Sequence, residues 1–175
     1  MRTVLVWLFC NLLVSWSHSA LGAQSVSAIR VIVPSSLEKV EGNSKSSLPF
    51  SDLVDFNFYL GPIHYQQVYD ASAFSKLPAD GAYLTFVAFR GDCLSREATT
   101  ATNLTVHLST TAAHADSLSG IFRDNSGPDE VKVFETQRAP FGGEGTPCPS
   151  AFSLSGFAPS VPFFLNPAKG NLLLN

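Results

Sequence analysis

The chain has 175 residues, a length that favours one domain. Charged residues make up 14% of it, against about 25% in typical soluble domains. The formal net charge is −3 at pH 7, and no basic run is present. We therefore expect no nucleic-acid partner. The polar surface must come mainly from Ser, Thr, Asn and Gln, which is common in exported β proteins.

The N-terminus has the pattern of a secretory signal. Arg2 gives a short positive start, and residues 4–14 then form an apolar run interrupted only by Asn11. A polar stretch at residues 15–19 is followed by small residues at 20–23. This is the order in which a signal peptide presents its charged, apolar and cleavage regions.

We expect a signal peptide over residues 1–23, cleaved after Gly22 or Ala23, and a mature domain over residues 24–175. The apolar run is shorter than the roughly 20 residues that a membrane span needs. No second long apolar run follows. The sequence thus predicts a protein that is exported to the periplasm, the cell surface or the medium, with no transmembrane anchor in this chain.

Alternation of apolar and polar residues dominates the remainder. It is clearest in residues 103–110, where apolar side chains fall on even positions, as in a half-buried strand. Residues 82–89 are apolar on both faces and predict a central strand covered on both sides. Further predicted strands cover residues 28–33, 55–59, 63–69, 131–133, 152–155, 162–165 and 172–174.

Turn clusters rich in Gly, Pro, Asn and Asp separate these strands, and together they predict an all-β fold, an antiparallel β-sandwich of jelly-roll type. The one helical candidate is residues 70–77, one or two turns long, with Asp70 or Ser72 as its N-cap. The chain stops in an apolar strand. We therefore expect the sandwich to be truncated and incomplete at its C-terminus, with the partner of residues 172–174 lying beyond Asn175.

Two cysteines remain after cleavage, because Cys10 leaves with the signal. Cys93 and Cys148 form an even pair in an exported chain, which favours a disulfide, with two free thiols as the alternative. They lie far apart, without a CxxC motif or an adjacent histidine, so a zinc site is not expected.

The best candidates for a binding face are Tyr65, Gln67 and Tyr69, which share one face of a predicted strand. Aromatic rings stack on sugars and amides bond to hydroxyl groups, so these residues suggest a glycan platform. Tyrosines with buried rings and solvated hydroxyls would give the same pattern.

Three carboxylates, Asp124, Asp129 and Glu130, surround a Gly-Pro turn. Closely spaced oxygen ligands suit calcium, although the spacing is not that of an EF-hand. The alternative is a hairpin turn in which the carboxylates cap backbone donors.

Nothing in the sequence predicts a catalytic residue or a cofactor. His64, His107 and His114 lie outside any HExxH or HxH motif, and no GxSxG sequence is present. We interpret the histidines as surface or hydrogen-bonded side chains.

From about Ile29 to its end, the chain resembles the N-terminal region of uncharacterised exported bacterial proteins, many of which end in a PEP-CTERM sorting tail. The most specific parts of the resemblance are Tyr65-Gln66-Gln67-Val68-Tyr69 and Gly170-Asn171-Leu172-Leu173-Leu174. The other shared segments, in order, are Val33-Pro34, Glu41-Gly42-Asn43, Phe89-Arg90-Gly91-Asp92, residues 103–111, Leu118-Ser119, residues 127–133 and Pro162-Phe163.

This resemblance implies export and an envelope or extracellular setting, and it supplies no activity to transfer. The chain departs from the family in having no Pro-Glu-Pro, C-terminal helix or basic end. The sequence therefore predicts a non-enzymatic structural or surface protein of the cell envelope or extracellular matrix, whose partners are extracellular polysaccharide or envelope components. The alternative is a carbohydrate-binding module.

Overall fold

The structure, a computed structural model, describes residues 4–9, 28–41, 63–90, 99–141, 149 and 156–175. Within these ranges the chain forms two antiparallel sheets and four short 3₁₀ helices. The predicted all-β, antiparallel two-sheet fold is confirmed. The strands predicted at residues 55–59 and 152–155, and both Cys93 and Cys148, lie outside the described residues.

The first sheet, called sheet A here, has the order β2-β1-β4-β7, and β8 also pairs with β4. Its strands are β1 (Val4–Phe9), β2 (Ala28–Val33), β4 (Ala82–Phe89), β7 (Gly156–Phe157) and β8 (Phe163–Leu165). β4 is paired on both edges, which confirms a central strand, but Tyr83 is 38% exposed, so the predicted covering of both faces holds only in part. β1 is formed by residues that the sequence assigns to the signal peptide.

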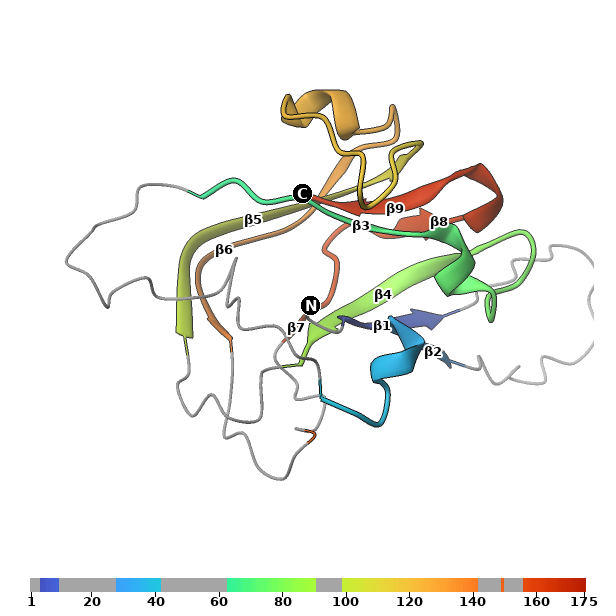
Figure 1. Cartoon of the computed structure of the whole chain (residues 1–175). Helices are drawn as coiled ribbons and strands as arrows, with labels where there is room; N and C mark the ends of the chain where they lie inside the picture. Colours follow the sequence, from blue (N-terminus) through green and yellow to red (C-terminus); the bar gives the residue numbers. More distant parts are fainter. Residues whose placement is uncertain (1–3, 10–27, 42–62, 91–98, 142–148, 150–155) are drawn as a thin grey trace, which may run out of the picture.

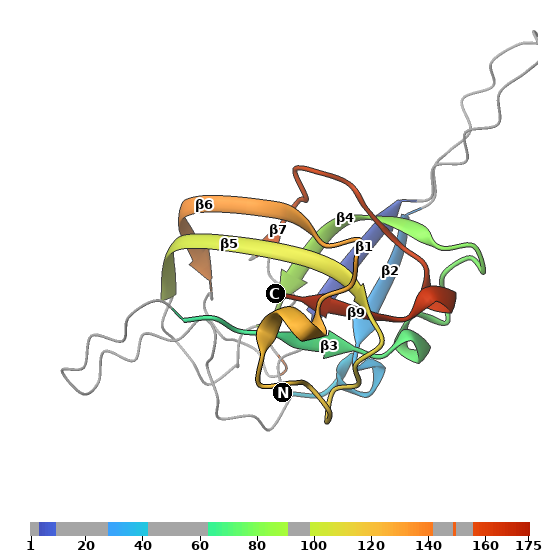
Figure 2. The same ribbon diagram turned by 90° about the horizontal axis from the view of Figure 1, so that it is seen from above.

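The second sheet, sheet B, has the order β3-β9-β5-β6. Its strands are β3 (Gln67–Tyr69), β5 (Thr99–Thr111), β6 (Val131–Phe141) and β9 (Asn171–Leu174). Sheet B lies above sheet A in Figure 1, and Figure 2 shows the two layers from above. β3 is shorter than the strand predicted over residues 63–69.

One apolar core fills the space between the sheets. It joins Val31 of β2 and Leu84 of β4 to Leu108 of β5 and Leu172 of β9. The period-two pattern of β5 is confirmed on this face, where Val106 and Leu108 are buried. Burial of apolar surface from two opposed sheets is the main force that holds such a sandwich together.

The four 3₁₀ helices are η1 (Ser35–Leu37), η3 (Ala71–Phe74), η4 (Phe122–Asn125) and η5 (Pro167–Lys169). The helix predicted over residues 70–77 is therefore a single 3₁₀ segment. Asp70 is its N-cap residue but its side chain makes no capping hydrogen bond. Asn171 of β9 takes over the capping, because its Oδ1 accepts a hydrogen bond from the Ala71 N–H at 2.8 Å.

The expectation that the final strand lacks a partner was wrong. β9 pairs with β3 on one edge and with β5 on the other, so Leu173 lies between Val68 and Ser109. The partners come from segments far earlier in the chain, which the sequence pattern alone does not reveal. Leu172 and Leu174 enter the core, and Leu173, on the opposite face of the sheet, has no exposed surface.

The buried position of Leu173 gives a test of this arrangement. We expect Leu173→Ala to lower the free energy of unfolding by about 2–5 kcal/mol, because it leaves a cavity under a paired strand. Val161→Ala, which shortens an exposed apolar side chain, is the control and should change it by less than about 0.5 kcal/mol. Denaturant unfolding measures both, and equal small losses would contradict the position of β9.

Candidate functional site

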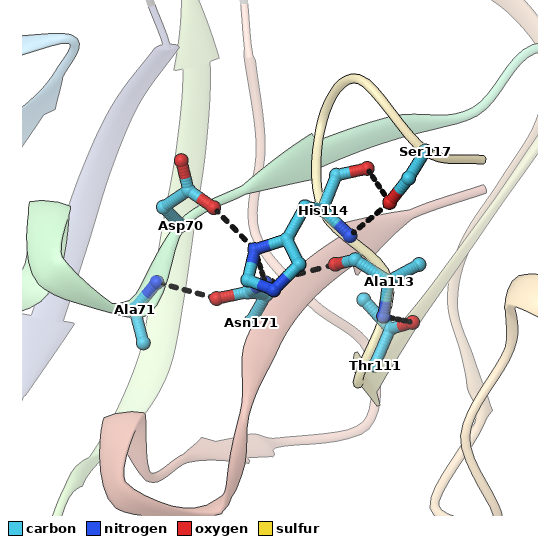
Figure 3. Close-up of polar contacts among 7 residues, drawn as sticks. All are labelled: Asp70, Ala71, Thr111, Ala113, His114, Ser117 and Asn171. Atoms are coloured by element: carbon cyan, nitrogen blue, oxygen red, sulfur yellow. Dashed lines mark hydrogen bonds and ion pairs between the residues drawn. The ribbon is translucent and has the colours of Figure 1, made fainter.

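Polar side chains gather at both ends of β9. At its start, Asn171 is almost fully buried, with 7% of its surface exposed. Its Oδ1 binds Ala71 as described, and its Nδ2 donates to the Ala113 carbonyl at 2.8 Å. Figure 3 shows that this one side chain joins η3 to the segment after β5. Both of these 2.8 Å hydrogen bonds of the Asn171 side chain are to backbone groups, which indicates a structural role.

The same corner contains Asp70, His114 and Ser117, the residue types of a serine-hydrolase triad (Figure 3). The His114 Nδ1 lies 3.6 Å from an Asp70 carboxylate oxygen and 3.5 Å from the Asn171 Nδ2. The Ser117 Oγ, however, accepts from the His114 backbone N–H at 3.2 Å and contacts the His114 carbonyl oxygen at 3.4 Å. In a catalytic triad, the serine hydroxyl is hydrogen-bonded to the histidine ring nitrogen that does not face the carboxylate. Here the serine closes a turn instead.

At the other end of β9, Asn175 also links β9 to neighbouring segments by hydrogen bonds. Its backbone N–H and carbonyl pair with those of His107 at 3.0 and 2.7 Å. Its Nδ2 donates to Glu130 at 2.9 Å, and its Oδ1 is hydrogen-bonded to His64. The His64 ring in turn stacks on Phe122, with ring centroids 3.9 Å apart.

A segment that we call the cap, residues 112–130, lies against one part of the outer face of sheet B and includes η4, the gold ribbon at the top of Figure 1. Gln66 holds it: its Nε2 donates to the Phe122 carbonyl at 2.9 Å, and its Oε1 accepts from the Asn125 Nδ2 at 2.7 Å. The Gly127 N–H donates to the Ser109 Oγ at 3.3 Å, and a Cβ on Gly127 would overlap the Thr110 carbonyl. The cap therefore lies directly against β5, which explains why Ser109 is buried on a face predicted to be polar.

The three carboxylates proposed for calcium are bound to different protein groups. Asp129 accepts hydrogen bonds from the backbone N–H and the hydroxyl of Thr110. Glu130 accepts from Ser126 as well as from the Asn175 amide, and Asp124 lies 3.6 Å from Arg123. Within the described ranges, no three His, Cys, Asp or Glu side chains are grouped closely enough to hold a metal ion. Of the three, Asp129 fits the turn-capping alternative, because it accepts from a backbone N–H, whereas Asp124 and Glu130 contact side chains.

The proposed tyrosine platform is not assembled as an exposed surface. Tyr69 is 5% exposed and lies in the core, while Tyr65 and Gln67 are half-buried. The Tyr69 hydroxyl is buried and has no hydrogen-bond partner among the residues that the structure describes. Burial raises the pKa of this hydroxyl well above its ordinary value, and Tyr65 raises it further.

A different aromatic pair is exposed on sheet A. Tyr83 of β4 and Phe164 of β8 are cross-strand neighbours, 38% and 42% exposed. Their ring centroids are 5.0 Å apart at an interplanar angle of 67°. This edge-to-face geometry stabilises the strand pair, but it does not offer the coplanar rings on which a sugar chain lies flat.

The candidate binding site is a cleft of about 230 Å³ between β2, η1 and η3. Val31, Ile32 and Ala73 supply its apolar lining. Its polar lining consists of Arg30, Ser35, Glu38, Ser72, Ser75 and Lys76. Three hydroxyls, two cations and one carboxylate suit a small, hydroxyl-rich ligand that carries negative charge. Sequence analysis missed the cleft, because its two sides are about forty residues apart and share no motif.

Comparison with known proteins gives no match among family models, curated proteins or solved structures. None of the helices in the described ranges is long and apolar enough to cross a membrane.

The buried Tyr69 hydroxyl gives a prediction. A buried hydroxyl without a partner costs stability, so Tyr69→Phe should raise the free energy of unfolding at pH 7 by about 1 kcal/mol. Tyr83→Phe, on a partly exposed ring, is the control and should change it by less than about 0.5 kcal/mol. Lower stability of Tyr69→Phe would contradict the unpaired hydroxyl.

The raised pKa of the Tyr69 hydroxyl also predicts how the free energy of unfolding changes with pH. The folded-state pKa of Tyr69 is raised, so its protonated form favours the folded state, and the unfolded chain loses this proton above about pH 10. The stability of the wild type should therefore fall above about pH 10 relative to Tyr69→Phe. Urea unfolding at pH 8 and pH 10.5 measures the difference.

Proposed function

We propose that this chain is an exported, non-enzymatic structural or surface protein of the cell envelope or extracellular matrix. The observation that carries the proposal is the use made of its polar residues. Four amide side chains make hydrogen bonds to backbone groups or to other side chains, and these bonds link separate strands and loops. They are Gln66, Asn125, Asn171 and Asn175. Such a network stabilises a surface scaffold. Asp70, His114 and Ser117 also make contacts of this kind, since Ser117 closes a turn on the His114 backbone and Asp70 lies beside the His114 ring.

Export is supported by the three-part N-terminus and by the resemblance to exported proteins with PEP-CTERM tails. A surface low in charge and rich in hydroxyl and amide groups fits contact with hydrated polysaccharide or envelope components. These are the partners that we propose.

Export is tested by expressing the full chain in a bacterial host and sequencing the N-terminus of the exported fraction. We expect it to begin at Ala23 or Gln24. A Leu12→Arg, Leu13→Arg double variant interrupts the apolar run outside β1 and should stay in the cytoplasm with Met1 or Arg2 at its start. An exported wild-type chain that begins at Met1 would contradict the proposed cleavage.

A second function, binding of carbohydrate, is favoured by the cleft beside β2. Its volume of about 230 Å³ is below the roughly 300–1,000 Å³ of pockets for drug-sized ligands. We therefore propose one sugar unit as its occupant. Arg30 and Lys76 favour an acidic sugar, and the serines bond to its hydroxyls.

This function is tested by titrating the exported chain with acidic and neutral oligosaccharides. We expect tighter binding of the acidic set, weakened by salt. Lys76→Glu should lower the affinity at least severalfold. Lys169→Glu, the same charge change on η5 at a residue that does not line the cleft, should leave it unchanged. Equal behaviour of the two variants would exclude the cleft as the site.

A further inference from the structure

The position of β1 in sheet A is the starting point. β1 pairs antiparallel with β2 from Val4↔Val33 to Phe9↔Ala28. It also pairs antiparallel with β4, from Val4↔Phe89 to Phe9↔Tyr83. β2 and β4 therefore lie on either side of it, and Figure 2 shows the three strands side by side. β1 is the only connection between β2 and the rest of sheet A among the described strands.

Cleavage after Gly22 or Ala23, proposed above, removes this strand. β2 and β4 would then face each other across an empty position, about two strand spacings or roughly 9.6 Å wide. We call this position the slot. Both of its edges would carry unpaired N–H and C=O groups. Val31, Val33 and Val87, which are buried in the core, lie on the two strands that border it.

β2 and β4 cannot simply close the slot by pairing with each other. Both run antiparallel to β1, so they run parallel to each other and would have to form a new kind of ladder. β4 is fixed on its other edge by β7 and β8. β2 packs against η1 and η3, and Val31 and Val33 join the core shared with sheet B.

We propose that the exported, processed chain is a strand acceptor, whose slot binds an extended apolar segment of another envelope polypeptide. The inference rests on the proposed export. The segment is about six residues long, uncharged, free of proline and antiparallel to both β2 and β4. Val-Leu-Val-Trp-Leu-Phe, the sequence of β1, is the template for its chemistry. Main-chain hydrogen bonds on both edges supply the affinity, as in other cases of strand addition.

The test uses processed chain purified from the exported fraction and a labelled peptide of residues 4–9 flanked by lysines. We expect saturable one-to-one binding and a melting temperature that rises with peptide concentration. A peptide with Val6→Pro keeps the length but lacks one N–H, so it should bind at least tenfold more weakly. The unprocessed Leu12→Arg, Leu13→Arg chain, whose own β1 fills the slot, should bind no peptide.

The outcomes separate this inference from the export on which it rests. Processed chain that melts cooperatively and binds neither peptide would show that its own residues fill the slot, which overturns the acceptor while export stands. Equal binding of the two peptides would show non-specific apolar association and would also overturn it. An exported chain that begins at Met1 would overturn cleavage and the acceptor together, because β1 would then stay in place.

Discussion

The double pairing of β9 is the constraint on which the rest of the structure depends. Four residues, Asn171–Leu174, hold β3 and β5 in one sheet by pairing with both. Their side chains serve both faces of that sheet, since Leu172 and Leu174 enter the core and Leu173 is buried on the side of the cap. The asparagine at each end of this segment then fixes the neighbouring loops. Asn171 places η3, and Asn175 together with Glu130 anchors the base of the cap.

The two sheets therefore differ in what they can do. The cap lies against part of sheet B, and the polar groups at this contact, including Gln66, Ser109 and Asn125, are used in hydrogen bonds within the chain. Sheet A carries the exposed aromatic pair, the cleft beside β2 and the strand that the sequence assigns to a signal peptide. The candidates for recognition consequently lie on sheet A or at its edge.

Local patterns were sufficient to predict β4 and β5, because period and apolar content report directly on which faces of a strand are covered. They could not predict which strands lie side by side. The sequence of residues 172–174 is the same whether the partner is β5 or a strand in another molecule, so the prediction of a missing partner was wrong. Ser109 was misassigned for a related reason, since the cap, which is distant from it in sequence, buries it. The sequence likewise left open whether Tyr69 is exposed or buried, and the structure places its ring in the core. The cleft escaped prediction because Arg30 and Lys76 share no motif and meet only in the folded chain.

β2 belongs to both candidate binding features. Arg30, Val31 and Ile32 line the cleft, and the same residues pair with Trp7, Val6 and Leu5 of β1. β2 is an edge strand that reaches the rest of sheet A through β1, so a strand in that position adds to the contacts with η1, η3 and the core that already hold β2. If the cleft and the slot bind the partners proposed above, a ligand in the ordered cleft would favour the filled slot, and by thermodynamic linkage a strand in the slot would favour the ligand to the same degree. The structural basis of both effects is a single six-residue strand, β2, which pairs with β1 and also packs against η1 and η3.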